Sequence, residues 1–359
     1  MLLVQNWTCA QGRDSDGKTP QSRTYDAENT HSPGKLSLCQ PLSRPACWAI
    51  DGPRRAKLSY QATDREIIDY QLTRLPGTEF AARAPLPSHL DGSVPFICAM
   101  GAAQTFGRFA ERPFLALLGN RLGAETLNLG SAGAGPRHYL RRPKVLEIIN
   151  RSSLVILQVM SGRSVSNSYF ENVYAGSLRP WSAPKDEKPR HAEIAYTELF
   201  ETKGEAFIRA LIAETRRNYI NEYIELIRAI KAPILLFWFS QRATNYTELY
   251  AHGVDRASGG FLGGFPQLVN SEMIAKLRPY VNSYVECITS RGLPQELRSR
   301  QTGNIVDIGI SPLYPGHNNY YPSPEMHEDA AAALESAVTS IFRSSLTNSD
   351  KKQPGDAAE

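Results

Sequence analysis

The sequence predicts an α/β fold, a three-layer α/β/α sandwich around a mainly parallel sheet of about five strands. Three short apolar runs of strand length lie between residues 94 and 167, and each ends in small or polar residues. Amphipathic segments of helical period separate these runs. Strands that alternate with helices indicate a parallel sheet covered on both faces. Ligands bind beyond the carboxyl ends of such strands, so we expect the three polar tails to meet at one site.

The first 93 residues divide into two predicted segments. Residues 1–44 are polar and lack hydrophobic periodicity, which predicts disorder. A start codon placed too early would explain the same composition. Residues 45–93 carry aromatic and apolar side chains, but prolines at 76, 85 and 87 break any long element. This segment is predicted to be an extended arm, with one short helix, that packs along the edge of the main domain.

The main domain is predicted over 94–345, with a polar, proline-rich insertion at about 164–200. A connection of that length is typical of a functional lid or a disordered loop. A long amphipathic helix over about 204–231 follows. The remaining elements are an apolar strand at 233–240, a short helix at 271–277, a strand at 283–289, an edge strand at 304–310 and a last helix capped by Ser323. The charged tail, 346–359, is predicted to be disordered.

Composition excludes several classes of protein. The formal charge is +4, and the basic residues are scattered among acidic ones, so no nucleic-acid partner is expected. The five cysteines form no CxxC pair and have no metal-ligand spacing, which predicts neither a metal site nor a disulfide scaffold. The longest apolar run, 232–239, is too short to span a membrane, and the start MLLVQNW is unlike a signal peptide. The expected location is the cytoplasm.

Four stretches carry a family resemblance. Residues 101–107 read GAAQTFG, 128–133 read NLGSAG, 160–163 read MSGR and 318–325 read NNYYPSPE. In this order they resemble the G-D-S-x-T-x-G, N-x-G-x-x-G, G-x-N-D and D-x-x-H-P blocks of the SGNH (GDSL-type) hydrolase superfamily of esterases and acyl transferases. The resemblance covers roughly 94–342. AQTFG and MSGRS also resemble an uncharacterised bacterial SGNH-like family, which implies a fold but no established activity.

The positions that carry the chemistry of the superfamily differ here. Ala103 matches the nucleophile, Tyr321 the general base and Asn318 its carboxylate partner. An acyl-enzyme mechanism needs all three groups, so the resemblance implies a degenerate member without serine esterase activity. The backbone N–H of Gly130 is retained and would serve an oxyanion hole.

Polar residues at the predicted strand ends suggest a binding site instead. Arg163 is expected to bind an anion, because a buried arginine is unfavourable without a counter-charge. The alternative is an internal salt bridge with Glu111, Asp307 or Glu325. The candidate ligand-binding residues are Gln104, Thr105, Gly130, Ser131, Arg163, Asn167, Arg242, Asn318 and Tyr321, and the candidate catalytic residue is His327. Tyr246, Tyr250, Tyr314, Tyr320 and Tyr321 are candidates for stacking on a sugar or for packing on the domain rim.

Two functions stay open. The first is an SGNH-like domain without the triad that binds an anionic or carbohydrate-type ligand. The second is an acyl or acetyl transferase of polysaccharide or lipid modification, in which coenzyme A phosphates would meet Arg163 and Arg242 and His327 would act as base. The expected partners are small-molecule, carbohydrate or acyl ligands. No metal is expected, coenzyme A is the one cofactor considered, and a scaffold with an empty pocket is a third alternative.

Overall fold

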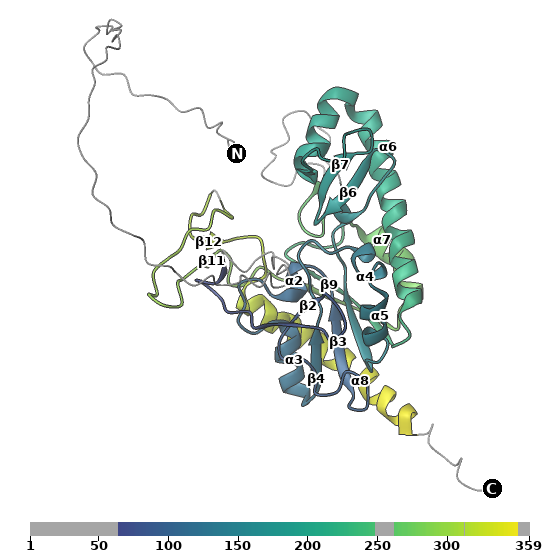
Figure 1. The fold of residues 1–359 in the computed structure, drawn as a ribbon, viewed down its shortest axis with the longest axis vertical. Helices are drawn as coiled ribbons and strands as arrows, with labels where there is room; N and C mark the ends of the chain where they lie inside the picture. Colours follow the sequence, from purple (N-terminus) through teal and green to yellow (C-terminus); the bar gives the residue numbers. More distant parts are fainter. Residues whose placement is uncertain (1–63, 248–261, 312, 351–359) are drawn as a thin grey trace, which may run out of the picture. The chain divides into compact units, whose positions relative to one another are not determined.

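A seven-stranded sheet forms the centre of the computed structural model, which describes residues 64–247, 262–311 and 313–350 (Figure 1). Its strands are β1 (Leu72–Arg74), β2 (Ala81–Arg83), β3 (Phe96–Met100), β4 (Glu125–Asn128), β5 (Leu154–Gln158), β9 (Ile234–Ser240) and β10 (Ser283–Ile288). The order is β1-β2-β4-β3-β5-β9-β10. The five strands from β4 to β10 are parallel, which confirms the predicted sheet.

Helices cover both faces of this sheet, which confirms the three-layer fold. They are α2 (Ala103–Phe106), α3 (Phe114–Leu122), α4 (Pro136–Leu140), α5 (Pro143–Ile149), α6 (Ala192–Ala229), α7 (Ser271–Leu277) and α8 (Pro324–Asp350). On one face, α3 and α8 pack on Ile97, Ile156 and Phe237. On the other face, α4 to α7 pack on the alternate residues of the same strands, such as Cys98 and Leu236. Every residue of β9 is buried, as the apolar run predicted.

The arm contributes the two antiparallel strands at one edge of the sheet. β1 pairs with β2, and β2 meets β4 through the pair Arg83 and Asn128. The prediction of an edge strand at 304–310 is wrong, because this segment forms no strand. Ile305 makes only a single bridge with Arg298, and the neighbouring short strands β11 (Gln295–Glu296) and β12 (His317–Asn318) pair with each other. Val306, Ile308 and Ile310 pack instead on a small separate cluster around Phe109 and Leu297.

The insertion is a folded module with its own core. It forms an antiparallel sheet of β6 (Phe170–Tyr174), β7 (Ser177–Pro180) and β8 (Arg190–His191), which leads into α6. α6 is broken at Gly204, where φ is 76° and ψ is 175°. Phe170, Leu178 and Tyr196 lie in the hydrophobic core of this module. Neither a disordered loop nor a simple lid describes the segment, and the helix after Gly204 is the long helix that was predicted.

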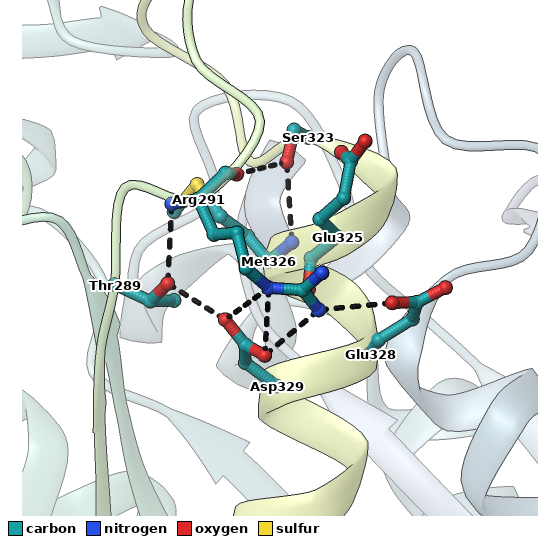
Figure 2. Close-up of polar contacts among 7 residues, drawn as sticks. All are labelled: Thr289, Arg291, Ser323, Glu325, Met326, Glu328 and Asp329. Atoms are coloured by element: carbon teal, nitrogen blue, oxygen red, sulfur yellow. Dashed lines mark hydrogen bonds and ion pairs between the residues drawn. The ribbon is translucent and has the colours of Figure 1, made fainter.

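The start of α8 has the predicted cap. The Oγ atom of Ser323 accepts a hydrogen bond from the N–H of Met326, at 3.1 Å, and Pro324 begins the helix. Figure 2 shows Arg291, which follows β10, lying across the first turns of this helix. Its guanidinium donates to the side chains of Glu328 and Asp329 and to the carbonyl oxygen of Glu325. The cluster therefore fixes the beginning of α8 against the end of β10.

Several expectations concern chain ends and burial. Residues 1–63 and 351–359 lie outside the described residues, so the predicted disorder of 1–44 is not addressed, while residues 346–350 are helical. Cys98 and Cys287, which lie within β3 and β10, are both buried free thiols. Burial raises the pKa of Cys287 to about 11, so this thiol stays protonated at neutral pH. In the described part of the chain, no helix is both long and apolar enough to cross a membrane.

Candidate functional site

The stretch 101–107 leaves β3 and forms the one-turn helix α2, which is bonded across to β5. Gln158, the last residue of β5, is fully buried. Its Oε1 atom accepts hydrogen bonds from the N–H of Ala102, at 2.8 Å, and from Oγ1 of Thr105, at 2.7 Å. The hydroxyl of Thr105, a predicted ligand-binding residue, is therefore used inside the fold. Gln158 was missed from sequence, although a polar residue that ends an apolar strand is a usable signal.

A buried arginine holds the segment that follows α2. Arg83, at the end of β2, is 5% exposed and has no carboxylate within bonding distance among its described contacts. Its guanidinium donates to the carbonyl oxygens of Phe106, Gly107, Ala110 and Glu111, at 2.7–2.9 Å. Burial lowers the pKa of Arg83 to about 10, so it remains charged at neutral pH. One side chain from the arm thus fixes the end of α2 and the segment that follows it.

The turn after β4 packs closely against α2. The side chain of Asn128 donates to the carbonyl oxygen of Thr105 and accepts from the N–H of Gly130, each at 2.9 Å. The amide of Gly130, assigned above to an oxyanion hole, is therefore occupied by Asn128. A Cβ atom at position 130 would lie 2.1 Å from the backbone nitrogen of Phe106, so only glycine fits. The backbone N–H of Ser131 is also bonded, to the carbonyl oxygen of Gly101 at 3.0 Å.

Arg163 forms a salt bridge and not the expected anion site. It lies in a short 3-10 turn, η1 (Gly162–Ser164), after β5. Its Nη1 atom pairs with Oε1 of Glu193 in the first turn of α6. The partner is none of the three carboxylates considered from sequence, because the insertion brings Glu193 to this position. Arg163 therefore links the main domain to the insertion.

Arg242, which follows β9, also has its guanidinium bonded to other parts of the protein. Its guanidinium donates to the carbonyl oxygens of Ala243, Gly264, Pro266 and Val269. It lies 5.0 Å from the centroid of the Trp238 ring, a cation–π distance. Burial lowers the pKa of Arg242 to about 10. Three of the five N–H groups of this arginine bond the segment 264–269 and a fourth bonds Ala243, so the expected phosphate contact is not supported.

Asn167 is a structural residue of the insertion. Its side chain is 5% exposed and donates to the hydroxyls of Tyr196 and Thr215, at 2.8 and 3.0 Å. Its Oδ1 atom accepts from the backbone N–H groups of residues 169 and 170. All these partners belong to the insertion or to α6, so the amide joins β6 to the helix and the expected ligand contact is not formed.

The pair Asn318 and Tyr321 closes the turn before α8. Asn318 is fully buried, and its Oδ1 atom accepts from the N–H groups of Tyr320 and Tyr321, at 3.1 and 2.8 Å. The hydroxyl of Tyr321 accepts from Nη1 of Arg108 at 2.9 Å, and the Arg108 guanidinium lies 4.7 Å from the centroid of the Tyr321 ring. Both residues therefore have structural partners at the positions that resemble those of the family's acid and base.

His327 lies in the core and not in a crevice. It is fully buried, and its ring stacks on Phe114 with centroids 6.1 Å apart. Its Nδ1 atom accepts from the N–H of Phe114 at 3.1 Å, at the start of α3. Burial, and secondarily the charge of Arg83, lowers the pKa of His327 to about 3. The imidazole is thus neutral and inaccessible at pH 7, which does not fit the catalytic role expected from sequence.

A pocket of about 160 Å³ lies at the carboxyl ends of β3 and β9. Gln104 lines it and is 3% exposed, and the Oε1 atom of Gln104 has no hydrogen-bond partner within the described residues. The hydroxyl oxygen of Tyr320 accepts from Nε2 of Gln267 at 3.1 Å, which leaves the hydroxyl hydrogen free to donate. The other lining residues are Phe239, Ser240, Gln241, Arg242, Gly264, Phe265, Pro322 and Met326. Of the predicted site residues, this pocket brings together Gln104, Arg242 and Tyr320.

The family model for "Domain of unknown function (DUF6473)" matches residues 58–174 and 196–342. The chain belongs to this DUF6473 family. The matched ranges include α2, β9 and the start of α8, which carry the pocket of the DUF6473 domain. The residues between the two matched ranges, 175–195, contain β7 and β8 of the insertion. No curated protein matches this DUF6473 chain.

Several solved structures are similar at low identity. A carbohydrate esterase family 2 enzyme from Corynascus thermopiles (Myceliophthora fergusii) is 12% identical over 72% of this chain and 68% of that chain, with a TM-score of 0.33. An acylhydrolase from Bacteroides fragilis is 13% identical over 82% and 100%, with a TM-score of 0.35. An acetylxylan esterase variant from Geobacillus stearothermophilus is 12% identical over 69% and 94%, with a TM-score of 0.32. Because the identities and TM-scores are this low, these similarities assign no activity to the DUF6473 domain.

Proposed function

We propose that this domain binds a small, neutral, carbohydrate-type ligand at its strand ends and does not hydrolyse it. The observation that carries the proposal is the side chain of Gln104, which lines the pocket and whose buried Oε1 atom has no partner in the described part of the chain. A buried polar atom of this kind costs about 1–3 kcal/mol unless it is bonded. A ligand hydroxyl or N–H would supply that bond.

The residues around the pocket do not favour serine-type catalysis. Ala103, at the position that resembles the nucleophile, has no attacking oxygen. Three nearby serine and threonine hydroxyls donate to amide or carbonyl oxygens and not to a base: Thr105 to Gln158, Ser161 to Gln267 and Ser240 to the carbonyl of Phe265. The absence of a triad therefore stays part of the proposal, supported by these contacts.

The charges favour a neutral ligand over an anionic one. The two arginines expected to meet an anion are engaged, Arg163 with Glu193 and Arg242 with four carbonyl oxygens. Binding of coenzyme A phosphates would have to break these contacts. The transferase alternative therefore has no observation in its favour.

The size and lining of the pocket suit one end of a sugar-like molecule. Its volume of about 160 Å³ is smaller than the roughly 300–1,000 Å³ of sites that enclose a drug-sized ligand. Phe239, Phe265 and Tyr320 supply aromatic surface for the C–H faces of a ring, and Gln104 and Tyr320 supply the polar contacts. We therefore expect one ring or ring substituent to be buried while the rest of the ligand stays outside.

Thermal-shift and calorimetric titrations of the full chain with neutral mono- and oligosaccharides test the proposal, with coenzyme A and acetyl-coenzyme A as comparison ligands. A ligand at 100 times its Kd should stabilise the fold by about 2.7 kcal/mol. Gln104→Leu should abolish the shift, whereas Gln301→Leu, a change at an exposed glutamine, should preserve it. No esterase activity on short acyl esters is expected. Binding of coenzyme A in preference to every sugar would refute the proposal. Hydrolysis of acyl esters that co-purifies with the protein would also refute it.

A further inference from the structure

We propose that the group buried in this pocket is an acetamido substituent, so that the ligand is an N-acetylated sugar and not a plain or O-acetylated one. The inference rests on the proposed function and names the ligand class of the same site. It follows from three features of the pocket: an acceptor without a donor, an apolar wall and a hydroxyl that can donate.

The acceptor distinguishes an amide from an ester. Gln104 is only 3% exposed, and its buried Oε1 atom has no hydrogen-bond donor among the described residues. An acetyl ester has two oxygens and no donor, so it would leave this atom unsatisfied. A secondary amide carries one N–H group, which would donate to Oε1.

The wall distinguishes an acetamido group from a hydroxyl. Phe239, Phe265, Pro322 and Met326 line the pocket with apolar atoms, and Phe239 and Met326 belong to a buried hydrophobic cluster. A sugar hydroxyl placed against these side chains would lose its water without gaining a partner. A methyl group placed there would gain from the burial of apolar surface.

The remaining polar contact suits the carbonyl oxygen of the amide. Tyr320 lines the same pocket, and its hydroxyl oxygen already accepts from Nε2 of Gln267. Its hydrogen has no acceptor among the described residues, and an acetamido oxygen would provide one. Arg242 is also a lining residue and is positively charged at neutral pH, and this charge disfavours the ammonium group of a free amino sugar at the same place.

Matched sugar sets provide the test. The full chain is titrated calorimetrically with N-acetylglucosamine, glucosamine and glucose, and then with the corresponding sets for galactose and mannose. We expect at least one N-acetylated sugar to bind ten times or more tightly than its amine and its 2-hydroxy parent. In NMR titrations, N-methylacetamide should shift resonances of Gln104 and Tyr320, and methyl acetate should not.

Two variants locate the contacts. Gln104→Glu keeps an acceptor for the N–H group and should retain part of the preference for the acetylated sugar, whereas Gln104→Leu should remove it. Equal binding of an N-acetylated sugar and its parent would overturn this inference and leave the proposed function standing. Binding of no sugar by the wild-type chain, or sugar binding that Gln104→Leu leaves unchanged, would overturn both.

Discussion

Replacing His327 with asparagine should reduce the loss of folding stability between pH 7 and pH 5, because the variant has no imidazole to take up a proton on unfolding. The imidazole is fully buried and accepts a hydrogen bond from the N–H of Phe114. The Oδ1 atom of asparagine can occupy the place of Nδ1, so the variant keeps the acceptor and loses only the titrating ring. A loss of packing lowers stability equally at every pH, so the slope with pH isolates the effect of the proton.

The sign and size follow from linkage. Burial holds the pKa of His327 at about 3 in the folded chain, against about 6.5 when the chain is unfolded. The unfolded state therefore binds one more proton between these values, and stability is lost as the pH falls below about 6.5. Between pH 7 and pH 5 the loss from this residue is about 2 kcal/mol.

Urea unfolding at pH 7 and pH 5 measures the effect, with the wild type and His327→Asn compared at each pH. Other groups titrate in both proteins, so their contributions cancel in the difference. The wild type should lose about 2 kcal/mol more than the variant over this interval. Equal losses in the two proteins would refute a buried, neutral histidine at this position.

Three further predictions concern the contacts that build the site. Arg83→Met should lower the free energy of unfolding by about 3 kcal/mol or more, since four carbonyl oxygens lose a charged donor, and Arg83→Lys should recover part of it in urea unfolding. Gly130→Ala should cost about 3 kcal/mol in the same assay, because its Cβ would strike the backbone of Phe106; a loss under 1 kcal/mol would contradict that contact. A double-mutant cycle of Arg163→Met and Glu193→Gln should give a coupling of only about 0.5–1 kcal/mol, as these side chains are 22% and 37% exposed, and no coupling would mean that the pair is not formed in solution.

The sheet could be predicted because its signals are local. A strand such as β9 is buried on both faces, so its whole sequence is apolar and can be recognised without a partner. The caps of α7 and α8 are equally local, since Asn270 and Ser323 bond to N–H groups three residues further along. The segment 304–310 misled for the same reason. Three of its apolar residues, Val306, Ile308 and Ile310, are partly buried, but they pack on a small separate cluster and not in a sheet.

The site could be predicted only in outline, because its contacts are between distant segments. The sequence indicated that Arg163 needs a partner, but Glu193 reaches it only through the insertion. The acceptors for Arg242 are backbone carbonyls, which any residue type supplies. Gln104 and Tyr320 were recognised as candidates in separate motifs. Phe239 completes their pocket from a strand whose pattern indicates only a buried core residue.

The long helix α6 contributes residues to two separate hydrophobic cores, one after the other along its length. Ile208 and Leu211 belong to the core of the insertion, and Tyr219 and Tyr223, two to three turns further on, belong to the core under the main sheet. A local opening of the insertion would therefore fray the helix that supports β5, where the Tyr223 hydroxyl bonds the carbonyl oxygen of Gln158. We expect the backbone amides of both cores to exchange with solvent hydrogen as one cooperative unit. A substitution that destabilises the insertion should therefore also lower the exchange protection of the amides in β5.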